Sequence, residues 1–113
     1  MLEYFFILSL IVQCIHGSEA LIMGAHREWY LFTMPFWVLL LWEIVFLGFW
    51  STVYVVPGFP WREHLEALFL VLMFANGLQH IVWWGTRKSY VPGIFTAPLH
   101  VVVFLAFYFS VLF

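Results

Sequence analysis

A few polar side chains lie within stretches of sequence that are otherwise apolar and long enough to cross a membrane. Polar and ionisable groups at membrane depth are rare and costly, so each one predicts a functional role. The imidazole, carboxylate and amide groups among them are suited to acid/base chemistry or to metal binding. The residues of this set are Gln13, His16, Glu19, Glu43, Asn76, His80, Thr96 and His100.

Their spacing predicts that they converge. Residues three or four apart lie on the same face of a helix, and the pairs with this spacing are His16 with Glu19, Asn76 with His80, and Thr96 with His100. At 1.5 Å per residue, the three histidines lie about 10 Å below the same membrane surface. Their helices alternate in direction, so this shared depth does not follow trivially from the spacing. We therefore expect the three imidazoles to meet inside a helix bundle.

Two kinds of site fit this set. In the first, the catalytic residues His16, Glu19, Asn76 and His80 transfer a proton to or from a lipophilic substrate. In the second, a zinc or iron ion is bound by His16, Glu19, His80 and His100, with a position left for water or substrate. Haem or a chlorophyll-type pigment bound through a histidine is a further alternative. Gln13, Glu43 and Thr96 complete the intramembrane polar set. Because no cation is near, Glu43 is expected either to be protonated or to pair with Gln13 or a histidine.

The composition explains why these residues stand out. Of the 113 residues, 65% are hydrophobic, 23% are aromatic and only 9% are charged, against about 25% charged in an average soluble domain. So small a soluble domain could not bury this much apolar surface. The four basic and six acidic residues form no patch for nucleic acid. One cysteine, Cys14, allows neither an internal disulfide nor a zinc finger, and we expect it to be buried.

The elements that must position the site are membrane-spanning helices. Polar and turn-forming breaks leave apolar segments at roughly 2–23, 29–55, 63–85 and 94–113, and each is long enough to cross about 30 Å of hydrocarbon. The sequence thus predicts an all-α integral membrane protein, with residues 1–113 forming one domain, a bundle of four transmembrane helices. The first segment lacks the basic start of a signal peptide, so we interpret it as a retained helix.

Basic residues in the loops predict the orientation. Arg27, Arg87 and Lys88 lie in the first and third connections, and only Arg62 lies in the second. Positive residues favour the cytoplasmic side. Both termini are therefore expected on the non-cytoplasmic side, in a plasma membrane that would be the inner membrane of a bacterium.

Three motifs resemble a known family. They are His16-Gly-Ser-Glu19, Asn76-Gly-Leu-Gln-His80 and Arg87-x-x-Tyr90-Val-Pro92-Gly93-x-x-Thr96-Ala97. Together they resemble the small bacterial membrane proteins named for an HXXEE motif, over roughly residues 16–97. The second glutamate of that motif is Ala20 in this chain. The resemblance implies a bacterial membrane protein and brings no assigned activity with it.

Three functions follow from these observations. The first is an intramembrane enzyme with isomerase, cyclase or hydrolase-type chemistry on a lipid or isoprenoid. The second is a non-catalytic small subunit of a larger membrane complex, since the loops are short and the aromatic faces are large. The third is a small proton-coupled transporter, in which polar side chains relay protons. The expected partners are membrane lipids, a lipophilic small molecule, and further copies of the chain or other subunits; nucleic acid is not expected.

Overall fold

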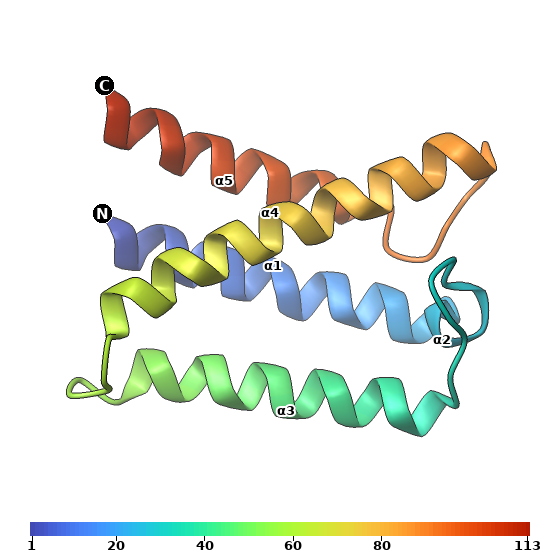
Figure 1. Cartoon of the computed structure of the whole chain (residues 1–113), viewed down its shortest axis with the longest axis horizontal. Helices are drawn as coiled ribbons and strands as arrows, with labels where there is room; N and C mark the ends of the chain where they lie inside the picture. Colours follow the sequence, from blue (N-terminus) through green and yellow to red (C-terminus); the bar gives the residue numbers. More distant parts are fainter.

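The computed structural model describes residues 1–113 and is helical throughout (Figure 1). Its helices are α1 (Leu2–Ile22), α2 (Ala25–Glu28), α3 (Phe36–Val55), α4 (Arg62–Arg87) and α5 (Ala97–Leu112). Helices α1, α3 and α4 are long and apolar enough to cross a membrane. The apolar α5 has 16 residues and a length of about 24 Å at 1.5 Å per residue. The predicted all-α class is thus confirmed, with three candidate membrane spans and a shorter apolar helix.

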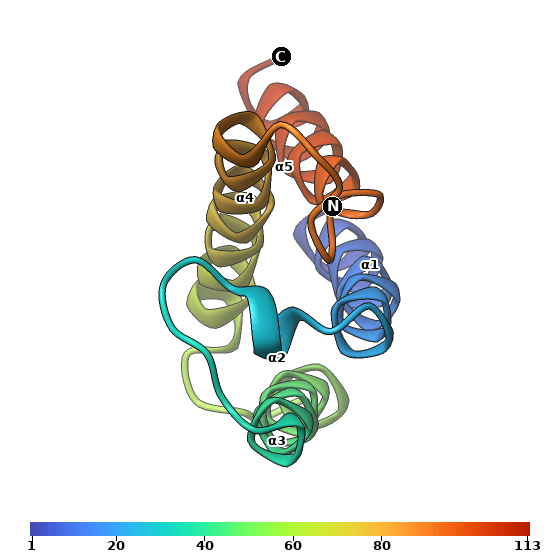
Figure 2. The ribbon, with the colours of Figure 1, turned by 90° about the vertical axis from the view of Figure 1, so that its right-hand side faces the viewer.

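The helices form a bundle that is open on one side. Helices α1, α4 and α5 pack against one another, whereas α3 contacts α1 and α4 and makes no contact with α5. Figure 2 shows the short α2 lying across one end of the bundle, between α1, α3 and α4. Both chain termini lie at the opposite end (Figure 1).

An aromatic core holds the end nearer the termini. It consists of Phe6, Trp50, Val53, Phe69 and Met73, from α1, α3 and α4. Phe6 meets Phe69 edge to face, with ring centroids 5.1 Å apart, and the centroid of Trp50 lies 5.0 Å from that of Phe69. Burying aromatic side chains contributes the most per residue to such a core. Away from it, α3 has few buried residues, and apolar side chains such as Trp37 and Ile44 point outward, as lipid contact requires.

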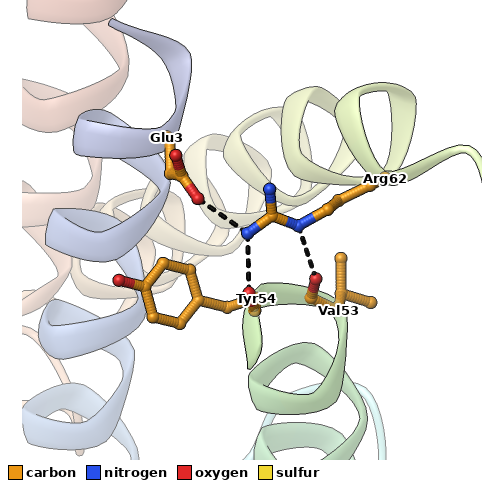
Figure 3. Close-up of polar contacts among 4 residues, drawn as sticks. All are labelled: Glu3, Val53, Tyr54 and Arg62. Carbon is orange, nitrogen blue, oxygen red and sulfur yellow. Dashed lines mark hydrogen bonds and ion pairs between the residues drawn. The ribbon is translucent and has the colours of Figure 1, made fainter. Parts of the chain in front are cut away.

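Arg62 ties three helices together beside this core (Figure 3). Its Nη2 donates hydrogen bonds to Glu3 Oε1 at 2.6 Å and to the Tyr54 carbonyl at 2.6 Å, and its Nε donates to the Val53 carbonyl at 3.0 Å. The last carbonyls of a helix have no partner within the helix. Arg62, the first residue of α4, therefore caps the end of α3 while pairing with the start of α1.

Two helix starts differ from the sequence prediction, and proline or glycine accounts for each. The segment expected to be helical from residue 29 becomes α3 only at Phe36, because Pro35 adopts an extended ψ of 150° as the residue before the helix. Residues before a proline are pushed out of the helical region. The last helix begins at Ala97 instead of residue 94, because Gly93 takes a φ of +97° in a preceding turn.

The chain between α4 and α5 folds back into the bundle instead of staying outside it. Val91, Pro92 and Gly93 in this connection are all buried. We call residues 88–96 the inserted loop. Close packing of α5 on α4 follows from Gly77, where a Cβ would lie 2.7 Å from the Ala97 carbonyl oxygen. The prediction that Cys14 is buried was wrong, since its side chain is exposed on the outer face of α1.

Candidate functional site

Three histidines meet in the bundle interior. The ring centroids of His16 and His80 are 4.5 Å apart, and those of His16 and His100 are 5.3 Å apart, with the rings nearly perpendicular in both pairs. The residues come from α1, α4 and α5 and are between 1% and 6% exposed. The predicted convergence of the three imidazoles from three helices is therefore confirmed.

Glu19 holds the inserted loop in place. Its carboxylate accepts hydrogen bonds from the backbone N–H groups of Gly93 at 3.0 Å, Phe95 at 3.3 Å and Thr96 at 3.1 Å. It also accepts from the hydroxyls of Tyr90 and Thr96, each at 2.7 Å. Backbone N–H groups in an apolar surrounding need such partners. Both carboxylate oxygens are occupied by the loop, so Glu19 acts here by positioning residues around it.

A hydrogen-bonded chain connects this carboxylate to an imidazole. The Thr96 hydroxyl gives its proton to Glu19, and its oxygen lies 2.7 Å from His16 Nδ1. Since a hydroxyl has one proton to donate, the bond from the ring must be donated by His16 Nδ1–H. The proton of the neutral ring is thus on Nδ1, and Nε2 keeps a free lone pair.

Glycines allow the closest approaches at the site. A Cβ at Gly93 would lie 2.8 Å from the Cε1 atoms of both His16 and His80, so the inserted loop touches both rings with its backbone. A Cβ at Gly17 would lie 2.6 Å from Glu43 Oε2. Side chains at either position would push an imidazole or the Glu43 carboxylate away.

The amide of Gln13 connects a second group of polar residues. His100 Nε2 donates to Gln13 Oε1 at 2.9 Å, and Asn76 Nδ2 donates to the same oxygen at 3.4 Å. Gln13 Nε2 in turn donates to Glu43 Oε2 at 3.3 Å. The expectation that Glu43 pairs with Gln13 or a histidine is confirmed for Gln13. This group joins α1, α3, α4 and α5 at one level.

Three residues of these networks were missed in the sequence. Gln79 donates to Asn76 Oδ1 at 3.1 Å and accepts from Trp29 Nε1 at 3.2 Å. Gln79 lies three residues after Asn76 within an apolar stretch, so the spacing would have placed both amides on the same helix face. Tyr90 was noted only as part of the third motif, and nothing local in the sequence distinguishes Trp29 from the other aromatic residues.

A cavity of about 610 Å³ adjoins the histidines. It lies between α1, α3, α4 and the segment that contains α2, and 11 of its 17 lining residues are hydrophobic. His100 is buried and does not line the cavity. His80 lines the cavity and is 6% exposed, yet its Nδ1 has no hydrogen-bond partner. The polar lining residues are Gln13, His16, Glu43, Asn76, Gln79 and His80.

Tyr90 is a fixed donor at the edge of the site. Burial, and next the hydrogen bond to the Glu19 carboxylate, raise the pKa of Tyr90 from 10.0 to about 12. Its hydroxyl therefore keeps its proton throughout the physiological range and stays bonded to Glu19.

Several ligating atoms of the predicted metal site take part in hydrogen bonds. No group of three or more His, Cys, Asp or Glu side chains is placed so that it could hold a metal ion. His16, Glu19 and His100 each use a ligating atom in a hydrogen bond with the protein. A zinc or iron ion on His16, Glu19, His80 and His100, like haem or pigment, stays a prediction from the sequence.

No protein-family profile, curated protein or solved structure matches the chain. The resemblance to the HXXEE proteins stays a prediction from the three motifs. The structure adds that Glu19, of the first motif, accepts hydrogen bonds from Tyr90, Gly93 and Thr96, of the third. Function is therefore argued from the site itself.

Proposed function

We propose that this chain is an intramembrane enzyme that transfers a proton to or from a lipophilic substrate bound in the cavity beside His16 and His80. In this proposal α5 is the fourth membrane span, and both termini lie on the non-cytoplasmic side of a bacterial plasma membrane. The substrate enters from the lipid phase, where apolar molecules are concentrated. It is a lipid or isoprenoid.

The observation that carries the proposal is the contact between an apolar cavity and two buried imidazoles. Ligand sites are concave, mostly apolar and supplied with a few convergent polar groups. The 610 Å³ cavity has this character, with Asn76 and Gln79 as amides that can orient a polar group of the substrate. Histidine is the residue that most often serves as general acid or base.

The hydrogen bonds suggest a role for each group. The free lone pair of His16 Nε2 accepts a proton from a carbon of the substrate. His16 Nδ1 is bonded to the Thr96 hydroxyl, and that hydroxyl is bonded to the Glu19 carboxylate. The negative charge of Glu19 therefore stabilises the imidazolium that forms on His16. His80 starts as the imidazolium and donates its proton at the other end of the allylic unit, so that the double bond shifts. The proton taken up by His16 then passes to His80, whose ring centroid lies 4.5 Å from that of His16, and both rings return to their starting state. The net reaction is an isomerisation that needs no other reactant.

Solvent deuterium tests this without knowledge of the substrate. The purified protein is incubated in D₂O with liposomes of a total bacterial lipid extract, and lipids are examined by mass spectrometry. A proton-transferring enzyme places deuterium on a carbon of one lipid class. We expect this label with the wild type, a loss of at least about 100-fold with His80→Ala, and full labelling with His64→Ala, which changes an exposed histidine away from the cavity.

The result is interpretable only with folded variants, so helix content and thermal unfolding are measured for each. If a folded His80→Ala protein labels lipids as fast as the wild type, proton transfer by this site is excluded. If the wild type itself leaves all lipids unlabelled, the non-catalytic subunit becomes the better explanation of the chain.

A further inference from the structure

Glu43 is the only carboxylate that lines the cavity, and no lysine, arginine or aspartate lines it. It lies on one face of α3, because the α3 residues that line the cavity recur at helical spacing. They are Val38, Leu39, Trp42, Glu43 and Phe46. The single acidic group is thus presented to the cavity by a helix, and not by a loop.

No basic side chain of the chain neutralises Glu43. Arg62 pairs with Glu3 at 2.6 Å, and Arg87 pairs with Glu28 at 3.1 Å. One Glu43 oxygen has a 3.3 Å bond from Gln13, and the other makes no hydrogen bond with the protein. Carboxylates at membrane depth normally pair with a cation or a polar partner. Glu43 has the polar partner Gln13 through one oxygen only, so its other oxygen is free to meet a positive group of a ligand.

Aromatic rings surround the same space. Trp42 stacks on Phe46 with centroids 5.7 Å apart and an interplanar angle of 30°, and Trp29 meets Phe32 with centroids 4.8 Å apart. All four rings line the cavity. Ring faces attract ammonium groups, most strongly where water is excluded. A carboxylate and several ring faces together favour a positive group and disfavour a phosphate.

We propose that the cavity selects a lipophilic cation, an amphiphile whose amine or quaternary ammonium group lies beside Glu43 and whose chain fills the apolar remainder. This names the substrate class of the site and so rests on the proposed function. A hydrocarbon chain covers the apolar walls. The ammonium group meets Glu43 and the aromatic rings near Gln13, which leaves the histidines free to face the chain.

Binding of three matched probes tests this selectivity. The purified protein is placed in nanodiscs of neutral phosphatidylcholine, with empty nanodiscs as the background. The radiolabelled probes are dodecyltrimethylammonium, its uncharged analogue with carbon in place of nitrogen, and dodecyl sulfate. We expect the ammonium probe to bind at least tenfold more tightly than the uncharged analogue, and dodecyl sulfate to show no binding above background.

Glu43→Gln should remove the preference and leave the uncharged analogue bound as before. Glu63→Gln is the matched control, because it removes the same charge from an exposed position outside the cavity. Equal binding of the charged and uncharged probes by the wild type overturns the proposal, and that comparison needs no variant. Retention of the preference in Glu43→Gln also overturns it.

The outcome is separable from that of the deuterium experiment. Selective binding of the cation without any labelled lipid leaves the cation site and removes proton transfer. Labelled lipid together with unselective probe binding leaves the enzyme and removes the cationic substrate class.

Discussion

His16 and Thr96 are joined by a 2.7 Å hydrogen bond between Nδ1 and Oγ1, although 80 positions separate them in the sequence. The bond links the C-terminal half of α1 to the residue just before α5. It also makes the orientation of one imidazole depend on the Glu19 carboxylate, through a single hydroxyl. Several consequences of this relationship can be measured.

Thr96→Val removes the hydroxyl with little change of shape. We expect His16 to lose its fixed Nδ1–H tautomer and proton transfer to fall by about tenfold or more, equivalent to about 1.4 kcal/mol in the barrier. The ¹⁵N chemical shifts of the His16 ring report the tautomer directly. Thr96→Ser keeps the hydroxyl and should restore both properties. A Thr96→Val protein with an unchanged His16 spectrum would show that the hydroxyl does not position the ring.

Glu19→Gln leaves an amide where five hydrogen bonds converge on a carboxylate. The new NH₂ group faces N–H donors, so we expect a loss of roughly 2–3 kcal/mol in the free energy of unfolding. Hydrogen exchange should accelerate at the amides of residues 93, 95 and 96 and stay unchanged in the middle of α3. Glu63→Gln serves as the control and should unfold like the wild type. Unchanged exchange in the inserted loop would contradict the role assigned to Glu19.

Gly93→Ala tests the contact between the inserted loop and the histidines. Its φ of +97° disfavours any side chain, and the added Cβ would lie 2.8 Å from both His16 and His80. We expect destabilisation of at least about 1–2 kcal/mol from the backbone alone, with altered ring signals of both histidines. Gly85→Ala is the comparison, since a Cβ there meets nothing within 4 Å, and it should be neutral or slightly stabilising. Equal unfolding temperatures for the two variants would refute the close contact.

Tyr90 gives the stability a dependence on alkaline pH. Its pKa is raised to about 12 in the folded protein, against about 10 for a free tyrosine. A pKa that is higher in the folded state means that the contribution is complete below pH 10 and is lost as the pH rises toward 12. Thermal unfolding between pH 9 and 12 should therefore show a steeper decline for the wild type than for Tyr90→Phe. The tyrosinate absorbance of the wild type minus that of Tyr90→Phe should rise near pH 12, and a rise near pH 10 would disprove the bonded hydroxyl.

Much of the site was predictable because depth in a membrane can be counted along a helix. The shared level of His16, His80 and His100 needed only helix ends and a rise per residue, and the rings indeed meet. Gln13 was one of the alternatives expected for Glu43, beside protonation and a histidine partner, because few polar groups lie at that depth. Because few polar residues lie at membrane depth, each of them has few possible partners, and pairings there are easier to predict.

The parts that were missed depend on backbone conformation. Residues 29–35 and 94–96 are apolar enough to read as helix, and the turn at Gly93 and the extended Pro35 appear only when the chain is folded. The catalytic role of Glu19 stays a prediction, and the bonds of its oxygens to amides of a loop more than 70 positions away were not foreseen. Side chains that bind backbone amides leave no residue-type pattern in the sequence, so their role was not predictable.

The span between Glu19 and its partners also sets an order of events during synthesis. Tyr90 follows Glu19 by 71 positions and Thr96 by 77. At about 5–20 residues per second, the ribosome needs roughly 4–15 s to make the segment that binds this carboxylate. During that interval α1 has been made but Glu19 has none of its final donors. The C-terminal end of α1 can therefore reach its final hydrogen-bonded arrangement only after residues 90–96 have been made.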